Sequence, residues 1–163
     1  MLFNSYIFIF LFLPISIIGF YLIKKINYQN LAVVWLVLVS LFFYGWWNFK
    51  YLILILISII LNYLFGFVIK KQNKKIYLIL GIIINLFIIG YFKYSNFFLE
   101  NINILLKDEF ILNQIILPLG ISFFTFQQIT YLVDTYNGKN EDHNFINYFL
   151  FVIFFPQLIA GPI

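Results

Sequence analysis

The sequence predicts an all-α, polytopic transmembrane protein with about six membrane segments, the last of which can re-enter the bilayer instead of crossing it. Three observations lead to this prediction. Of the 163 residues, 64% are hydrophobic and only 10% are charged, whereas soluble domains carry roughly a quarter charged residues. The apolar residues form runs as long as a bilayer is thick, and lysines stand between the runs. A soluble chain of this length has too little interior to bury so much apolar surface.

The first expected span, Phe3–Ile23, is interpreted as a retained membrane helix and not as a signal peptide. No positive residue precedes its apolar run, and the run is longer than the apolar part of a usual signal peptide. Pro14 and Gly19 are expected to bend this helix, which a bundle tolerates because neighbouring helices can satisfy the freed backbone groups. Because Lys24 and Lys25 follow the run, we expect the N-terminus to lie outside the cell.

Three further stretches have at least the roughly 17 residues that a membrane helix requires. Each is apolar on every face, as spans are and amphipathic surface helices are not. They are Leu31–Trp47, Tyr51–Ile69 and Ile76–Phe92. The aromatic stretch between the first two is typical of a membrane interface, where Tyr and Trp side chains are enriched. We expect this aromatic belt to comprise Tyr44, Trp46, Trp47 and Tyr51.

The placement of the lysines predicts the orientation in the membrane. The clusters at 24–25 and 70–75 follow the first and third spans and so share one side, while the other side has only Lys50 and Lys93 nearby. The positive-inside bias assigns the clusters to the cytoplasm. All ten basic residues are lysines, and lysine clusters beside apolar runs fit membrane anchoring and argue against a nucleic-acid partner.

The character of the sequence changes after the fourth span. Between Lys93 and Leu117 apolar residues recur at three- and four-residue spacing among charged ones. This pattern predicts an interfacial helix on the outer face, and a polar loop is the alternative. Two more membrane segments are then expected. They are a span at about 115–136 and, after a polar cytoplasmic turn at 137–144, the proline-containing apolar segment Phe145–Ile163.

The stretch LPLGISFFTFQQITYLVDTY, residues 117–136, is unusual for a membrane segment because it holds a proline, a glycine, two amides and an acid. Pro118 is expected in the first turn of the helix, where a missing N–H costs little. Gly120 is expected to permit the close approach of another backbone.

Three polar residues of this stretch, Gln127, Thr130 and Asp134, are spaced so that they share one face of a helix. They are our candidate site residues, with two interpretations left open. In the first, they are interhelical hydrogen-bonding groups, each worth only about 0.6–2 kcal/mol. In the second, they line a substrate path, because polar residues inside a membrane are candidates for function.

Other chemical constellations are sparse. The absence of cysteine excludes disulfides and Cys-based metal sites. The single histidine, His143, stands beside Glu141 and Asp142 in a polar turn, and neighbours in sequence do not converge on one ion. We therefore expect no metal site, and the residues alone identify no catalytic group in this chain.

The sequence as a whole resembles the membrane-bound O-acyltransferase superfamily. The resemblance is carried by the stretch at 117–136, the short polar turn and the final NFINYFLFVIFFPQLIAGPI. It is closest in character to the bacterial branch that acetylates alginate or peptidoglycan and D-alanylates teichoic acid. The opening MLFNSYIFIFLFLPI and the stretch SLFFYGWWN are similar to the alginate acetylase subgroup, so the resemblance covers the chain end to end.

The resemblance implies an enzyme that transfers acetyl groups to hydroxyls of an extracytoplasmic polysaccharide in the bacterial inner membrane. It implies an acyl donor (acetyl-CoA or an acyl carrier), a polysaccharide acceptor and an extracytoplasmic acetyl-transfer partner protein, but no bound cofactor. The family's catalytic histidine is expected downstream of AGPI, and His143 does not match it. Residues 1–163 are accordingly expected to form a single transmembrane domain, the N-terminal part of a longer fold, inactive alone.

The alternative is a non-enzymatic protein, either a small membrane transporter or a scaffold subunit. The polar residues at 127–134 and the short chain favour this alternative. Charged pairs at mid-membrane and internal repeats are frequent in transporters. The sequence shows neither, which counts against the transporter alternative.

Overall fold

The structure is a computed structural model that describes residues 4–26, 29–106, 115–140 and 144–160. Within these ranges it contains helices and no strand, which confirms the predicted all-α class. A π-helical turn, η1 (Phe8–Phe12), continues directly into the first α-helix. The α-helices are α1 (Leu13–Lys25), α2 (Gln29–Trp47), α3 (Phe49–Gln72), α4 (Lys75–Leu106), α5 (Ile121–Tyr136), α6 (Phe145–Ile153) and α7 (Phe155–Ala160).

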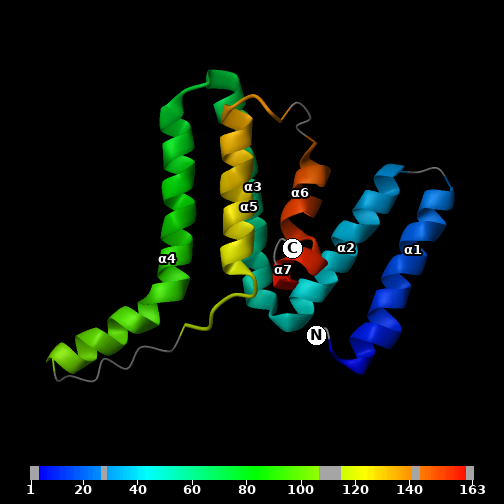
Figure 1. Cartoon of the computed structure of the whole chain (residues 1–163), viewed down its shortest axis with the longest axis horizontal. Coiled ribbons are helices and arrows are strands. Elements are labelled where there is room, and N and C mark those ends of the chain that lie inside the picture. Colours follow the sequence, from blue (N-terminus) through cyan, green and yellow to red (C-terminus); the bar gives the residue numbers. More distant parts are fainter. Residues whose placement is uncertain (1–3, 27–28, 107–114, 141–143, 161–163) are drawn as a thin grey trace.

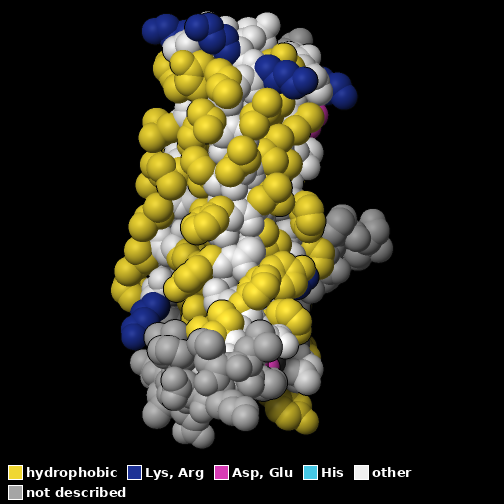
Figure 2. All heavy atoms as spheres, turned by 90° about the vertical axis from the view of Figure 1, so that its left-hand side faces the viewer, with side chains coloured by type: hydrophobic (Ala, Val, Ile, Leu, Met, Phe, Trp, Pro, Cys, Tyr) yellow, Lys and Arg dark blue, Asp and Glu magenta, His cyan; other side chains and the backbone are white. Residues whose placement is uncertain are grey.

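Successive helices run in opposite directions, so the α1–α2, α3–α4 and α5–α6 connections lie at one end of the molecule (Figure 1). This end carries Lys24 and Lys25 in the last turn of α1 and Lys70 and Lys71 in the last turn of α3. Figure 2 shows basic side chains at the same end, above a broad hydrophobic surface. The three regions that the sequence places on one side of the membrane therefore share one end of the fold, which we call the lysine end.

Among the described residues, three helices are long and apolar enough to cross a membrane: Phe8–Lys25, Phe49–Gln72 and Lys75–Asn103. They correspond to the first, third and fourth predicted spans. Two shorter apolar helices, Asn30–Trp46 and Phe145–Gln157, match the second predicted span and most of the last predicted segment. The many exposed apolar side chains on the outer faces of these helices are consistent with lipid as the solvent.

The first helix is irregular at its start rather than at Gly19. The π-helical turn precedes α1, and Pro14 stands in the first turn of α1, where its missing N–H costs little. Gly19 makes room for a neighbour, because a Cβ built there would lie 2.5 Å from the indole ring of Trp35. The indole N–H of Trp35 donates to the Ser16 carbonyl at 3.0 Å. Gly19 thus lets α2 pack closely against α1.

Helix α4 contains both the fourth predicted span and most of the predicted interfacial helix. Its 32 residues correspond to about 48 Å at 1.5 Å per residue, more than the roughly 30 Å of a bilayer core. Its second half turns away from the bundle as an arm (Figure 1). The hydroxyl of Ser95 donates to the Tyr91 carbonyl one turn earlier, an interaction that often bends helices. The arm is helical, not a polar loop, as far as Leu106, and 107–114 lie outside the described residues.

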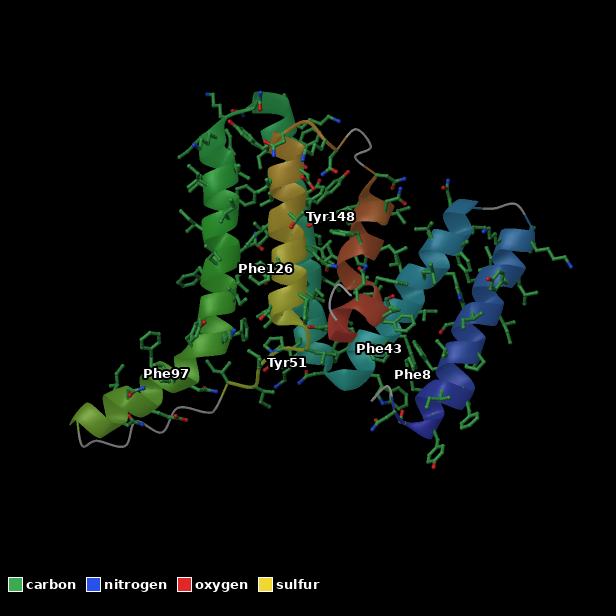
Figure 3. The ribbon with its side chains drawn as sticks, viewed as in Figure 1. Phe8, Phe43, Tyr51, Phe97, Phe126 and Tyr148 are labelled. Atoms are coloured by element: carbon green, nitrogen blue, oxygen red, sulfur yellow. The ribbon has the colours of Figure 1, made fainter. Side chains whose placement is uncertain are left out.

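The segment before α5 is held by side chains from α2, α3 and α4. The hydroxyls of Tyr44 and Tyr51 donate to backbone carbonyls within 116–119. Asn96 accepts from the N–H of Ile115 at 3.0 Å and donates to its carbonyl at 2.8 Å. Tyr51 lies beside this segment in Figure 3. These bonds satisfy backbone groups that have no helical partner. Such partners are needed in a membrane because no water is present there to form the missing hydrogen bonds.

These contacts change two expectations. Tyr44 is fully buried, so it does not belong to an interfacial aromatic belt, whereas Trp46 is exposed as expected. Helix α5 begins at Ile121, and Pro118 precedes the helix instead of standing in its first turn. Gly120 has φ 66°, in the left-handed region that glycine adopts without steric cost. Its conformation lets the chain turn into α5.

The main core lies where α5 packs between α3 and α4, with α2 and α6 alongside. Small residues allow the close approach, as is common between membrane helices. A Cβ at Gly66 of α3 would lie 2.6 Å from the ring of Tyr131, and one at Gly81 of α4 would lie 2.7 Å from a methyl of Leu132. A second, aromatic cluster joins η1 and α2 to α7, with the rings of Phe8 and Phe43 5.8 Å apart (Figure 3).

The last segment is broken near its middle. Helix α6 ends at Ile153, and Phe154 has ψ 109°, which interrupts the helix before α7 begins. Pro156 stands at the start of α7, a position that proline tolerates. Gly161 and Pro162 lie outside the described residues. Re-entry of this segment into the bilayer stays a prediction.

Candidate functional site

A cluster of four buried polar side chains joins α3, α4 and α5 inside the core. The Gln128 side-chain oxygen accepts from the Ser58 hydroxyl at 2.7 Å and from the Asn62 amide at 3.0 Å. Asn85 donates to the Asn62 side-chain oxygen at 2.6 Å and to the Gly81 carbonyl at 2.8 Å. All four side chains of the cluster are at most 3% exposed.

We interpret this cluster as structural, because its members bond to one another across three helices. The side-chain nitrogen of Gln128 is buried without a hydrogen-bond partner among the described residues. Sequence reasoning missed the cluster, although a signal was present. Ser58 and Asn62 are one helical turn apart in an otherwise apolar span, and Asn85 stands alone in the next. Isolated polar residues in membrane spans need partners on other helices, and Gln128 supplies one.

The three predicted residues lie on another face of α5, toward α6. Gln127 donates to the side-chain oxygen of Gln157 at 3.2 Å, and its own side-chain oxygen is buried with no partner among the described residues. Thr130 is exposed, and its hydroxyl donates to the Phe126 carbonyl in its own helix at 3.0 Å. Asp134 is half-buried one turn further on. The structure therefore brings the three together along one groove.

The first pocket of this groove lies near the lysine end and has a volume of about 290 Å³. We call it the tyrosine pocket. Among the described residues, its walls carry hydroxyls, amides and one carboxylate but no cationic side chain. The lining residues are Tyr63, Thr130, Tyr131, Asp134, Asn140, Asn144, Asn147, Tyr148 and Phe151.

The second pocket lies further along α5 and has a volume of about 390 Å³. We call it the phenylalanine pocket. It is mainly aromatic, with polar groups from two glutamines and a threonine. The lining residues are Phe123, Phe126, Gln127, Thr130, Phe151 and Gln157.

The tyrosine pocket contains one buried polar group, the Tyr148 hydroxyl, that the described part of the fold does not satisfy. The rings of Tyr131 and Tyr148 pack against each other with centroids 4.0 Å apart, and Figure 3 shows Tyr148 on the α5 side of α6. The Tyr148 hydroxyl is buried and has no hydrogen-bond partner in the part of the chain that the structure describes. An unsatisfied buried hydroxyl costs free energy unless something binds it. A ligand with neutral hydrogen-bonding groups would suit this pocket, whereas the carboxylate of Asp134 disfavours an anion.

Among the described residues, no group of three or more His, Cys, Asp or Glu side chains could hold a metal ion. His143 and its acidic neighbours lie outside the described residues. The chain is thus a helical membrane protein with a polar-lined groove between α5 and α6.

Comparison with known proteins shows which enzymes the chain resembles. The chain is 42% identical over 193 residues to a peptidoglycan O-acetyltransferase of Helicobacter pylori, a match that covers 100% of this chain and 37% of that protein. It is 39% identical over 173 residues to a probable alginate O-acetylase AlgI of Pseudomonas aeruginosa, covering 100% of this chain and 32% of that protein. A probable alginate O-acetylase AlgI of Azotobacter vinelandii is 36% identical. No family model matches the sequence, and no solved structure matches it significantly.

These matches confirm the resemblance predicted from the sequence. The whole chain is similar to a part of the peptidoglycan and alginate O-acetylases of bacteria. It spans about a third of the length of the curated relatives it matches.

Proposed function

We propose that this chain is part of a membrane enzyme that transfers acetyl groups to hydroxyls of an extracytoplasmic polysaccharide. The observation that carries the proposal is the similarity of the whole chain to relatives named for O-acetylation of peptidoglycan and of alginate. The alternative of a transporter or scaffold subunit has no comparable support.

The groove between α5 and α6 supports this proposal physically. An acyl donor that enters a membrane protein requires a path with both apolar walls and hydrogen-bonding side chains, because no water is present in the bilayer to satisfy the polar groups of the donor. Gln127, Thr130 and Asp134 would form one wall of that path. The neutral polar lining of the tyrosine pocket suits the amide and hydroxyl groups of an acetyl thioester donor, either acetyl-CoA or an acyl carrier.

The reaction requires a general base, and no residue of this chain is assigned that role. The acceptor hydroxyl oxygen would attack the thioester carbonyl, the carbon–sulfur bond would break, and the hydroxyl proton would reach the departing thiolate through the base. General-base assistance contributes roughly 10²–10⁴-fold and needs the base within hydrogen-bond reach of that proton. By family resemblance we assign the base to a histidine on another segment of the whole protein.

The same proposal includes location and partners. We assign the protein to the bacterial inner membrane, with the lysine end in the cytoplasm and the N-terminus outside. We also assign it an extracytoplasmic acetyl-transfer protein as partner. Residues 1–163 form one transmembrane domain, the N-terminal part of the whole fold.

The proposal is tested by deleting the gene in its host and measuring base-released acetate from purified cell-wall and secreted polysaccharides. We expect the deletion to lower polymer-bound acetate and the intact gene to restore it. Unchanged acetate on every extracytoplasmic polymer, with the protein shown to be expressed in the parent strain, would reject the proposal.

A further inference from the structure

The tyrosine and phenylalanine pockets adjoin along the groove, and the same two side chains line both. These are Thr130 of α5 and Phe151 of α6. Phe151 also lines a third pocket, of about 360 Å³, together with Val33 and Leu36 of α2. It is the one residue common to the linings of all three pockets, so its ring stands where they meet.

The two boundary residues differ in how firmly they are held. The Thr130 hydroxyl is bonded within its own helix. Phe151 is 43% exposed and, in the described part of the chain, makes no ring contact. Its neighbours on α6 do, since Phe145 packs 5.6 Å from Phe149 and Tyr148 packs against Tyr131. The Phe151 ring can therefore change rotamer without losing an aromatic partner.

We propose that Phe151 is the size-limiting residue for acyl groups that move along the α5–α6 groove. This inference rests on the proposed acetyl-transfer function and adds a specificity determinant to it. The acyl group of a donor is apolar and is favoured in the phenylalanine pocket, while the neutral amide-bearing arm of the donor is favoured in the tyrosine pocket and its anionic phosphates stay outside both pockets. An acyl group must pass the Phe151 ring to reach that position, and a longer group meets more of the ring.

The first experiment measures acyl preference in the whole membrane protein. Transfer from acetyl-CoA and from butyryl-CoA to polysaccharide is compared for the unmodified protein, for Phe151→Ala and for Phe145→Ala. The control residue has the same type, lies on the same helix and is 38% exposed, but lines none of the three pockets. We expect Phe151→Ala to raise the butyryl-to-acetyl ratio by about tenfold, within the range that a methylene's fit produces. A ratio that stays unchanged while acetyl transfer continues would overturn the inference.

The second experiment needs no acyl transfer. Residues 1–163 hold no cysteine, so in a whole protein whose other cysteines are replaced by serine, Gln127→Cys introduces a single thiol in the phenylalanine pocket. A separate Lys71→Cys variant identifies the membrane side on which the lysine end is exposed. A membrane-impermeant methanethiosulfonate reagent is then applied to the Gln127→Cys protein from that side. We expect Phe151→Ala to speed modification at 127 severalfold and Phe145→Ala to leave it unchanged.

An unchanged modification rate in Phe151→Ala would also overturn the inference. A protein that transfers no acetyl at all would instead reject the proposed function. The modification rate would still decide whether Phe151 separates the two pockets, so the two failures are distinguishable.

Discussion

At the scale of single residues, the adjacent amides Gln127 and Gln128 have opposite surroundings. One step along a helix rotates the side chain by about 100°, which moves it from the α3–α4 side of α5 to the α6 side. Gln128 is fully buried and accepts two hydrogen bonds from α3. Gln127 faces the groove, and among the described residues its side chain bonds to Gln157 alone. The Gln128 amide therefore holds helices together, and the Gln127 amide is available to a ligand.

We expect Gln128→Leu to reduce the stability of the folded protein more than Gln127→Leu does. The first change leaves Ser58 and Asn62 buried with one acceptor fewer, at a cost of about 1–3 kcal/mol. The second removes a half-exposed bond worth under about 1 kcal/mol. The check is the unfolding midpoint of each purified variant in mixed detergent micelles. Equal midpoints for the two variants would contradict the assignment of Gln128 to the core.

Acetyl-transfer activity should depend on the polar side chains that face the groove. In the whole enzyme, we expect Gln127→Leu and Asp134→Leu to lower acetyl transfer by about tenfold, because they remove polar groups from the proposed path where a neutral polar ligand would bind. Phe98→Leu, on the exposed arm of α4, is the control and should have no effect. Polymer-bound acetate per amount of folded protein is the measurement. Equal tolerance of all three changes would mean that the groove-facing residues are incidental.

At the scale of helices, the position of α5 depends on two glycines and on the side chains that hold its leading segment. Gly66 and Gly81 leave space that Tyr131 and Leu132 fill. Tyr44, Tyr51 and Asn96 bond the backbone before the helix. The groove toward α6 is therefore set by packing on the opposite side of α5.

We expect Gly66→Ala to destabilise the protein by about 1–3 kcal/mol, because the new methyl would overlap the Tyr131 ring and force it or the helix to move. Gly90→Ala is the matched control. It lies inside α4, and no atom of a neighbouring helix lies within 4 Å of the added Cβ, so the change should be neutral or stabilising by up to about 1 kcal/mol. Unfolding midpoints of both variants test the difference. A loss at Gly90 as large as that at Gly66 would refute the packing argument.

The sequence was sufficient to predict α1, α3 and α4 as membrane helices, because each has an apolar run of the required length. It predicted the shared face of Gln127, Thr130 and Asp134, because helical spacing fixes that. It did not predict the start of α5, since Pro118 is compatible with a first turn or with the segment before it. It also missed the Gln128 cluster and the role of Phe151, because both depend on which helices become neighbours, and residues such as Ser58 and Asn85 carry no information about their partners.

At the scale of the whole molecule, charge and apolar surface are arranged along one axis. The lysine end carries the connections that follow α1, α3 and α5 (Figure 1), and the arm of α4 leaves the bundle at the opposite end. Exposed Phe97 and Phe98 on that arm suit the interfacial region of a bilayer. The tyrosine pocket lies near the lysine end, so the orientation decides which compartment supplies its ligand.

We expect the lysine end to face the cytoplasm, because basic residues near membrane helices are retained on that side. Residues 1–163 lack cysteine, so in a protein whose other cysteines are replaced by serine, Lys71→Cys and Asn101→Cys place single thiols at the lysine end and on the exposed arm of α4. A membrane-impermeant maleimide added to intact cells with a permeable outer envelope should label position 101 and leave position 71 unlabelled until the inner membrane is opened. Labelling of position 71 but not of position 101 in intact cells would contradict the predicted orientation and indicate the opposite one. The tyrosine pocket would then open to the outside, toward the polysaccharide and away from a cytoplasmic acetyl donor.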